Sequence, residues 1–415
     1  MKLVCGITIA GGGRKRFTCS VIRTVLIGLW WLIMGSESII QAAEWSVLPS
    51  ISMKGYYNSN LLLTPFPHEA TYGYWISPGT EFSARSERFE ISGRAALDFV
   101  DYYGDQQNRF TNINLPLRVR YRTERDEFGF TGGFVRDNTL MGELLNTGVV
   151  LQFTQRNLWT ANPTWTRDLS EKLAFQGGFK FSDASYQDGI RLGLVDYQMR
   201  GASAGFLYHA TEKDDIQLTG TYDDFNTRNA PFALQATFPG AVLSVTHSFT
   251  ETLQGTVYGG PRFVNSTTDA ASGSVESAST VWVYGVSLMK QFEQGSVQVN
   301  LTRDVFPSGF GLLIQTDRAG FRATYDMSET VSLSLDTSGY IASGVTSLAS
   351  GGGTIPDQKL FYAAPMITWK FMEWWKAEFS YGYRLRDVES FPDSATANMM
   401  TLMLTYYPPK LAISR

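Results

Sequence analysis

From residue 44 onward, the chain consists largely of stretches in which apolar and polar residues alternate one by one. In 89–99 the odd positions are apolar or small, whereas the even positions include Glu90, Arg94 and Asp98. In 112–122 apolar residues alternate in the same way with polar residues, several of them arginines. Because successive side chains of a strand point to opposite faces, each stretch predicts a β-strand with one apolar and one polar face.

The length of these stretches favours strands that cross a membrane. They run to about 10 residues or more, whereas strands of soluble proteins are most often about 5–6 residues long. A tilted strand needs about 9–11 residues to cross a bilayer. Aromatic residues also gather at the ends of many stretches, as in 72–75, 369–375 and 406–407, which is typical of the two membrane interfaces. A soluble β-sandwich would instead have shorter strands and an exposed polar face.

A short acidic turn recurs between the strands at intervals of about 35 to 46 residues. Its eight copies lie at 85–88, 124–127, 170–172, 212–214, 250–252, 293–295, 328–330 and 372–373. Each interval holds an alternating stretch, a longer polar stretch and a second alternating stretch, whereas a propeller blade would need four short strands there. The pattern therefore predicts pairs of long strands joined by long loops and tight turns, as in outer-membrane barrels with short periplasmic turns.

Counting strands around these turns predicts the size of the barrel. Two strands precede the first turn, two fill each of seven intervals, and two follow the last, which gives 18 strands. A miscount of one hairpin would give 16 or 20. Backbone groups inside lipid must all be paired, so such strands have to close on one another. We therefore expect an all-β fold, a closed antiparallel transmembrane barrel over 44–407, followed by a short periplasmic tail over 408–415. The even strand number predicts that both ends of the barrel are periplasmic.

The first 43 residues predict a signal peptide. A basic segment at 14–16 precedes an apolar run at 24–35, which is too short for a helix that spans a bilayer, and small residues follow at Ala42 and Ala43. Both cysteines, Cys5 and Cys19, lie in this leader, so a disulfide framework or thiolate metal site is not expected in the remainder. Without the leader, 30 basic and 38 acidic residues remain of the chain's 35 and 39, and this acidic balance disfavours nucleic-acid binding.

The sequence gives little support for an enzyme. The three histidines are His68, His209 and His247, and only His68 is predicted to lie in an outer loop. Outer-membrane lipases and proteases act at the outer leaflet, whereas His209 and His247 lie near predicted periplasmic turns. We therefore predict no catalytic residues, no metal site and no cofactor.

Charged residues on the predicted inner faces are the candidate functional residues. The predicted lumen lining consists of Arg94, Asp98, Arg118, Arg120, Arg122, Lys180, Arg200, Arg322, Glu378, Arg384 and Arg386. One interpretation is a charged lining that sets the ion selectivity of a pore, because rings of Arg or Lys favour anions. The other is a set of ion pairs that stabilises the barrel wall. Alternation alone leaves both interpretations open.

Several segments of the first half resemble a known family. They are 49–60 with Leu63 and Thr64, 136–140 with 143–148, 163–165 before the turn at 169–172, and 193–197. They resemble outer-membrane β-barrel proteins encoded with bacterial exopolysaccharide and exosortase (PEP-CTERM) systems. The resemblance implies a barrel that serves polysaccharide secretion, and it implies no catalytic residues.

These observations predict three alternative functions in a Gram-negative outer membrane. The first is a porin-like export channel for an exopolysaccharide, and the second is a general diffusion porin for small solutes. The third is a structural or assembly-partner barrel whose lumen is closed by its own loops. The expected partners are outer-membrane lipid, the barrel-assembly machinery, and either polysaccharide or small solutes.

Overall fold

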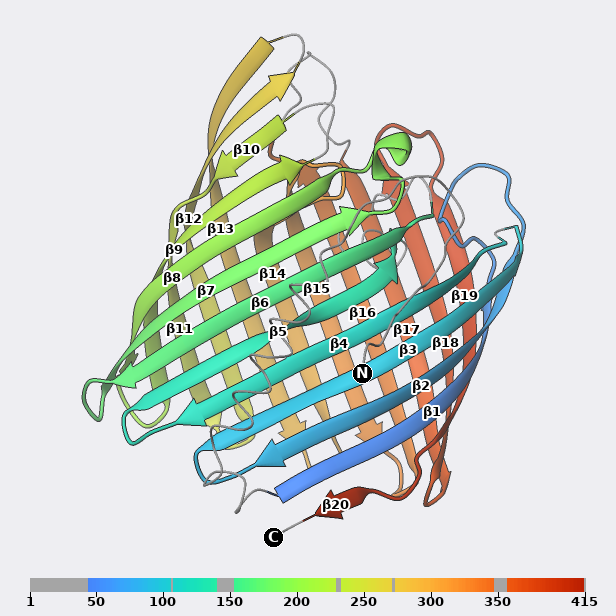
Figure 1. The fold of residues 1–415 in the computed structure, drawn as a ribbon, viewed down its shortest axis with the longest axis horizontal. Helices are drawn as coiled ribbons and strands as arrows, with labels where there is room; N and C mark the ends of the chain where they lie inside the picture. The colour runs from blue at the N-terminus through green and yellow to red at the C-terminus, as the bar shows by residue number, and fades with distance from the viewer. Residues whose placement is uncertain are drawn as a thin grey trace, which may run out of the picture.

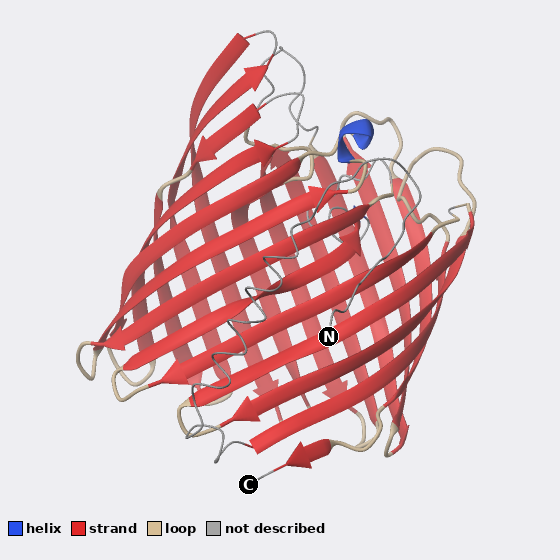
Figure 2. Cartoon of the chain, in the orientation of Figure 1, coloured by secondary structure: helices blue, strands red, loops and turns tan. Residues whose placement is uncertain are grey.

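The chain folds into one closed antiparallel β-barrel (Figures 1 and 2). The computed structural model describes residues 44–105, 107–139, 153–228, 233–270, 273–346 and 357–413. The first half comprises β1 Glu44–Asn58, β2 Thr71–Arg85, β3 Phe89–Gly104, β4 Arg109–Arg122, β5 Asp126–Asn138, β6 Gln155–Asp168, β7 Leu173–Tyr186, β8 Asp196–His209 and β9 Asp214–Arg228. The second half comprises β10 Ala233–Thr237, β11 Gly240–Thr250, β12 Leu253–Ala270, β13 Gly273–Phe292, β14 Gly295–Pro307, β15 Leu313–Asp326, β16 Val331–Gly344, β17 Gln358–Met372, β18 Trp375–Val388, β19 Ala395–Tyr406 and β20 Leu411–Ile413.

The described strands occupy 18 positions around the barrel. Each strand pairs with its neighbour in the sequence, and β10 and β11 share one position because both lie between β9 and β12. β19 returns to β1, where Asn58 pairs with Met399 and Ile51 pairs with Tyr406. This last ladder closes the barrel, so the predicted number of 18 strands is confirmed.

The eight predicted turns are confirmed within one to three residues. Each one lies between two hydrogen-bonded strands, and all eight lie at the same end of the barrel, here called the turn end (Figure 1). In the turn after β6, the amide of Leu173 donates to the Ser170 hydroxyl, and the amide of Leu169 donates to the Leu173 carbonyl. The opposite end, here called the loop end, carries the longer connections and, among the described residues, one 3₁₀ turn at Gly189–Leu192 (Figure 2).

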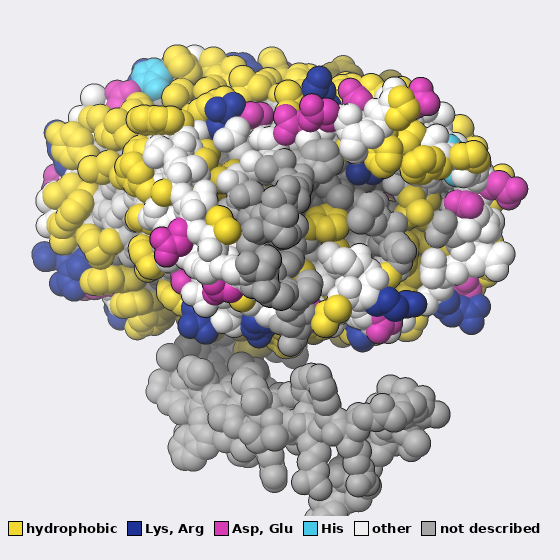
Figure 3. Space-filling view, turned by 90° about the horizontal axis from the view of Figure 1, so that it is seen from above, with side chains coloured by type: hydrophobic (Ala, Val, Ile, Leu, Met, Phe, Trp, Pro, Cys, Tyr) yellow, Lys and Arg dark blue, Asp and Glu magenta, His cyan; other side chains and the backbone are white. Residues whose placement is uncertain are grey.

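Cross-strand partners show which side chains share a face. Large apolar residues such as Met53, Leu97, Phe179 and Leu218 are exposed, and they alternate along their strands with polar or small residues. Hydrophobic side chains likewise form most of the outline of the molecule in the view from the loop end (Figure 3). The exposed apolar face is therefore the outer face, as expected for strands that contact lipid. Among the described residues, no helix is both long and apolar enough to cross a membrane.

The last strand extends the closing ladder. β19 contacts only the part of β1 from Ile51 to Asn58. Beyond the break at Pro408 and Pro409, β20 pairs with β1 again, and Val47 lies opposite Leu411. Residues 411–413 of the predicted tail therefore lie on the barrel edge at the turn end. The predicted signal peptide, 1–43, lies outside the described residues.

Two apolar clusters fill part of the interior near the loop end. The seam cluster lies beside the β1–β19 ladder, where the β1–β2 loop packs Leu61 and Leu63 against the inner face of the wall. Its buried members are Leu61, Leu63, Val100, Tyr102, Phe110, Tyr340, Ala342, Leu360, Ala395 and Ala397. The far cluster packs the loops after β7 and β14 against the wall between β7 and β15. Its fully buried members include Ala184, Phe225, Leu234, Phe238 and Leu313.

The β1–β2 loop is held in place by its own polar groups. The Asn60 side chain donates to the carbonyls of Thr64 and Thr396, over 2.8 and 3.1 Å, and its carbonyl oxygen accepts the Thr64 amide. Leu63 has a backbone φ of 50°, a left-handed conformation that is uncommon for a residue other than glycine. Its side chain is only 1% exposed, so burial of Leu63 offsets the cost of that conformation.

Candidate functional site

Most of the predicted lining residues lie on the inner face of the barrel. In β3 and β4, Arg118 lies opposite Ser92, on the face opposite to the exposed Leu97 and Leu115. The same comparison of cross-strand partners places ten of the eleven predicted lining residues on the inner face. They are Arg94, Asp98, Arg118, Arg120, Arg122, Lys180, Arg322, Glu378, Arg384 and Arg386.

The interpretation of Arg200 as a lining residue is wrong. In the β7–β8 ladder it lies opposite Phe181, whereas Gly201 lies opposite the inward-facing Lys180. Its guanidinium donates to the Gln198 side chain over 2.7 Å on the outer face. Arg200 lies toward the loop end of β8, where the outer face is polar again, so a charged residue there does not mark the lumen. The small residues 201–205 also hide the alternation in the sequence.

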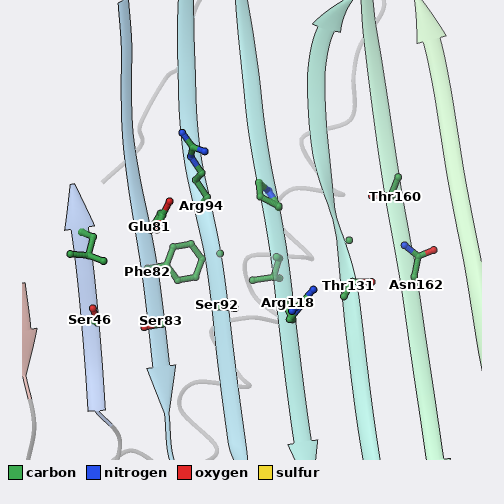
Figure 4. Close-up of a pocket in the computed structure, with 15 residues that line it drawn as sticks. Ser46, Glu81, Phe82, Ser83, Ser92, Arg94, Arg118, Thr131, Thr160 and Asn162 are labelled. Carbon is green, nitrogen blue, oxygen red and sulfur yellow. The ribbon is translucent and has the colours of Figure 1, made fainter. Parts of the chain in front are cut away.

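A pocket with both polar and apolar lining residues lies in the inner wall formed by β1 to β6, toward the turn end (Figure 4). It has a volume of about 530 Å³. Its polar side chains are Ser46, Glu81, Ser83, Ser92, Arg94, Arg118, Thr131, Thr160 and Asn162. We call this region the turn-end wall. Small hydroxyl and amide groups surround its two arginines, so the space beside them is open to water and small polar solutes.

Arg94 and Arg118 are exposed to this pocket. Among the residues that the structure describes, no carboxylate lies within ion-pair distance of either guanidinium. Arg94 lies opposite Glu81 in the β2–β3 ladder, but their charged groups do not pair. The turn-end wall therefore presents two guanidinium groups whose hydrogen-bond donors are available to an anion.

Other predicted lining residues form ion pairs. Arg120 and Arg122 both reach Glu127, over 3.4 and 2.5 Å. Arg322 donates to Asp336 over 2.9 Å. These exposed pairs match the second interpretation, because they connect neighbouring strands of the wall. Glu378 pairs with Lys376 over 3.0 Å, but this largely buried pair lies within β18 and connects no strands.

A network of buried charged groups lies nearer the loop end of the wall, next to the far cluster. Asp223 is fully buried; it forms an ion pair with Lys180 Nζ at 2.7 Å and accepts a hydrogen bond from Arg262 Nη1 at 2.6 Å. A side chain at Gly201 would collide with both Asp223 and Lys180, so glycine leaves the space that this contact needs. Alternation identified Lys180 but missed Asp223, which stands in the polar run 221–224, and Arg262, which follows two glycines and a proline that show no alternation.

Aromatic rings and cations share the inner face near the seam cluster. The ring of Tyr56 lies 6.3 Å from Trp75 and 5.9 Å from Tyr102. The ammonium of Lys54 lies over the Trp75 ring, and Arg384 lies over the ring of Tyr362 at 5.3 Å. Lys54 and these inward-facing aromatic residues are not among the predicted lining residues.

The histidines form no site with a third ligand. His209 contacts Asp215 and His247 contacts Asp214, each over 2.6 Å, close to the turn end. His68 contacts the Phe66 carbonyl at 2.7 Å. Within the described part of the chain, no group of three His, Cys, Asp or Glu residues is placed to hold a metal ion.

Comparison with known proteins adds similarities of fold. No protein-family model matches the chain, and no curated protein matches it. The solved structure of Pseudomonas aeruginosa OccK2 (OpdF) in complex with glucuronate matches with a TM-score of 0.44 and 10% identity, over 88% of this chain and 98% of that one. Acinetobacter baumannii OccAB2 matches with a TM-score of 0.45 and 10% identity, over 89% and 98%. BauA, the ferric preacinetobactin receptor of Acinetobacter baumannii, matches with a TM-score of 0.40 and 12% identity, over 86% and 80%.

Proposed function

We propose that this protein is a pore of a Gram-negative outer membrane that passes small polar solutes and favours anions. The observation that carries the proposal is the turn-end wall, where Arg94 and Arg118 are exposed to an open pocket without a described carboxylate partner. A barrel of 18 strands is wider than its own wall side chains can fill. Guanidinium groups on such a wall attract anions and repel cations, and this attraction weakens as salt screens it.

The orientation follows from the shape of the connections. We place the turn end in the periplasm and the loop end outside the cell, because outer-membrane barrels have short periplasmic turns and longer outer loops. The two apolar clusters then narrow the lumen on the outer side. A solute that enters from outside passes them first and reaches the turn-end wall afterwards.

The two clusters favour a second candidate, a structural barrel with a closed lumen. The seam cluster and the far cluster occupy inner faces on both sides of the barrel, and many of their members are fully buried. Export of a polysaccharide, which the family resemblance implied, stays a prediction. A hydrated polymer would need more width than a small solute, so the loops that form these clusters would have to move.

Conductance of the purified protein in planar bilayers tests the proposal. We expect stable channels, and a reversal potential in a salt gradient that shows chloride passing more readily than potassium. A barrel that inserts but conducts nothing at any voltage would contradict the pore and support the closed barrel. Current block by polysaccharide fragments, without block by small anions, would favour polymer export instead.

A further inference from the structure

A polar pocket lies at the loop end of the barrel, between the start of β4, the end of β5, the start of β6 and the loop after β7. We call it the rim pocket. Its volume is about 520 Å³, within the roughly 300–1,000 Å³ of typical ligand sites. Three arginines from three different elements line it: Arg109 of β4, Arg136 of β5 and Arg191 of the 3₁₀ turn after β7. The other polar side chains of the lining are Asn108, Thr111, Thr154, Gln155, Gln187 and Asp188.

The two strand arginines of the rim pocket belong to the outer face of the barrel. Arg136 lies opposite Ile113, and Ile113 lies opposite the exposed Leu97 of the outer face. Arg109 shares this face, because its partner Asp101 is four residues from Leu97 along β3. The rim pocket is therefore formed at the outer face of the wall, whereas the predicted lumen lining lies on the inner face.

The rim pocket lies just beyond the apolar band of the outer face. Along β5, the outer-face residues from Phe128 to Phe134 are aromatic or glycine, and Arg136 is the next one toward the loop end. The ring of Phe134 lies 4.5 Å from the ring of Trp159 in β6, and Trp159 is exposed. Exposed aromatic residues of this kind gather where the acyl chains of a bilayer meet its headgroups. Arg136 therefore lies at the depth of the lipid headgroups.

Positive charge is in excess in the rim pocket. Arg109 pairs with Asp101 over 2.5 Å, whereas neither Arg136 nor Arg191 forms an ion pair among the described residues. Asp188 is the one acidic side chain among the described residues of the lining. Arginine carries only hydrogen-bond donors, and phosphate oxygens fit its planar fork because they accept two parallel hydrogen bonds. The lining is therefore complementary to a phosphate group, as basic pockets at membrane headgroup depth are to anionic lipids.

We propose that the rim pocket binds the phosphorylated headgroup of a glycolipid of the outer leaflet. The phosphate contacts Arg136 and Arg191, and the sugar hydroxyls contact the amide side chains of the lining. The acyl chains lie along the apolar band, next to Phe134 and Trp159. A free phosphate ion would lack this apolar contact, which is the reason to assign the site to a lipid. The site rests on the proposed placement of the loop end outside the cell, and it does not depend on whether the lumen conducts.

Native mass spectrometry of the full-length protein, purified in detergent and freed of bound lipid, tests this site. The probes are lipid A with its phosphates intact and lipid A from which the phosphates have been removed. We expect the phosphorylated lipid to bind at least tenfold more tightly. Arg136→Gln and Arg191→Gln should each weaken its binding at least fivefold and leave binding of the dephosphorylated lipid unchanged. Arg191 is exposed in a loop, so we expect Arg191→Gln to fold whatever the substitution in β5 does to its strand.

The matched control is Arg167→Gln. Arg167 is an outer-face arginine near the turn end of β6, 3.6 Å from Asp126, so its loss makes the same change of net charge at the opposite membrane interface. Its removal should leave binding of lipid A unchanged. Equal binding of the two lipids by the wild type would overturn the site, as would an equal loss of binding in Arg167→Gln.

Calorimetric titration with inorganic phosphate distinguishes the two sources of a phosphate group. Inorganic phosphate should bind more weakly than lipid A, because it makes no apolar contact. Equal or tighter binding of inorganic phosphate would show a site for a solute and overturn the lipid. A barrel that conducts in planar bilayers but binds neither lipid would overturn the site without affecting the proposed pore. A barrel that binds phosphorylated lipid A without conducting would support the site and contradict only the pore.

Discussion

The turn-end wall and the buried network around Asp223 use the same residue types in opposite ways. In the turn-end wall, Arg94 and Arg118 are exposed to an open pocket and have no described carboxylate partner. In the network, Lys180 and Arg262 share a carboxylate that is completely buried. Both regions lie on the inner face, so facing the lumen does not by itself decide what a charged residue does.

The difference lies in access to water. An exposed guanidinium is stabilised by solvent and needs no partner, so it remains available to a passing anion. A buried cation needs an opposite charge nearby, and removal of that charge costs far more than the pair itself contributes. We infer that the turn-end wall serves solutes and that the network holds β7, β9 and β12 together.

Loss of the central carboxylate should give the largest effect. Asp223→Ala leaves the buried Arg262 with only the Asp304 carboxylate, 3.9 Å from its Nε, whereas Lys180 is partly exposed to solvent. We expect the free energy of unfolding to fall by about 3 kcal/mol. Urea titration of the protein in lipid vesicles, followed by tryptophan fluorescence, measures this change. The matched control is Asp336→Ala, because its partner Arg322 is well exposed, and its cost should stay below about 1 kcal/mol. An equal loss of unfolding free energy in the two variants would contradict the proposed distinction between the regions.

A charge on the outer face should have the next largest effect. Leu115 is exposed on the lipid side of β4, so Leu115→Arg should cost about 2–4 kcal/mol if it lies near the middle of the membrane. Thr160→Arg is the comparison, because it adds the same side chain to the turn-end wall, opposite Gly133 and Ser182 rather than another cation, and we expect it to cost little. Urea titration in vesicles again gives both values. A tolerated arginine at Leu115 would mean that the inner and outer faces of β4 are reversed.

Alternation and turns predicted the barrel because both are local features of the sequence. Arg118 and Leu115 belong to a strand with regular alternation, and their faces followed directly. Arg200 belongs to a strand rich in small residues beyond the apolar band, where polar side chains occur on both faces. The rule that charged residues face the lumen holds only for strand segments inside the bilayer. Alternation alone does not show which segments those are.

The interior could not be predicted because it depends on contacts between distant segments. Leu63 and Arg386 touch although 323 positions separate them in the chain. Asp223 and Arg262 come together only because β10 and β11 share one position between β9 and β12. The sequence indicates which residues are charged and which strand carries them, but the pairing partners depend on the register of the closed barrel.

The smallest expected effect concerns ion selectivity, and it tests the turn-end wall directly. Arg118 lies opposite Ser92 and Thr131, so Arg118→Glu creates no like-charge pair across the strands, and stability should change little. One unit charge acts on an ion at about 8 Å in water with about 0.5 kcal/mol, which screening at 0.1 M salt reduces to about 0.2 kcal/mol. Because the charge attracts anions and repels cations by this amount, it changes the ratio of anions to cations roughly twofold. Since the substitution changes two units, we expect a roughly fivefold shift toward cations.

Reversal potentials in a salt gradient measure this shift, and it should shrink as the salt concentration rises. Arg88→Glu is the matched control, because it makes the same change of net charge in the turn between β2 and β3, outside the wall. If both variants shift selectivity equally, the effect comes from the overall charge of the turn end, and Arg118 has no special position. A shift in Arg118→Glu alone would show that ions pass within a few ångströms of this wall, which a closed lumen does not permit.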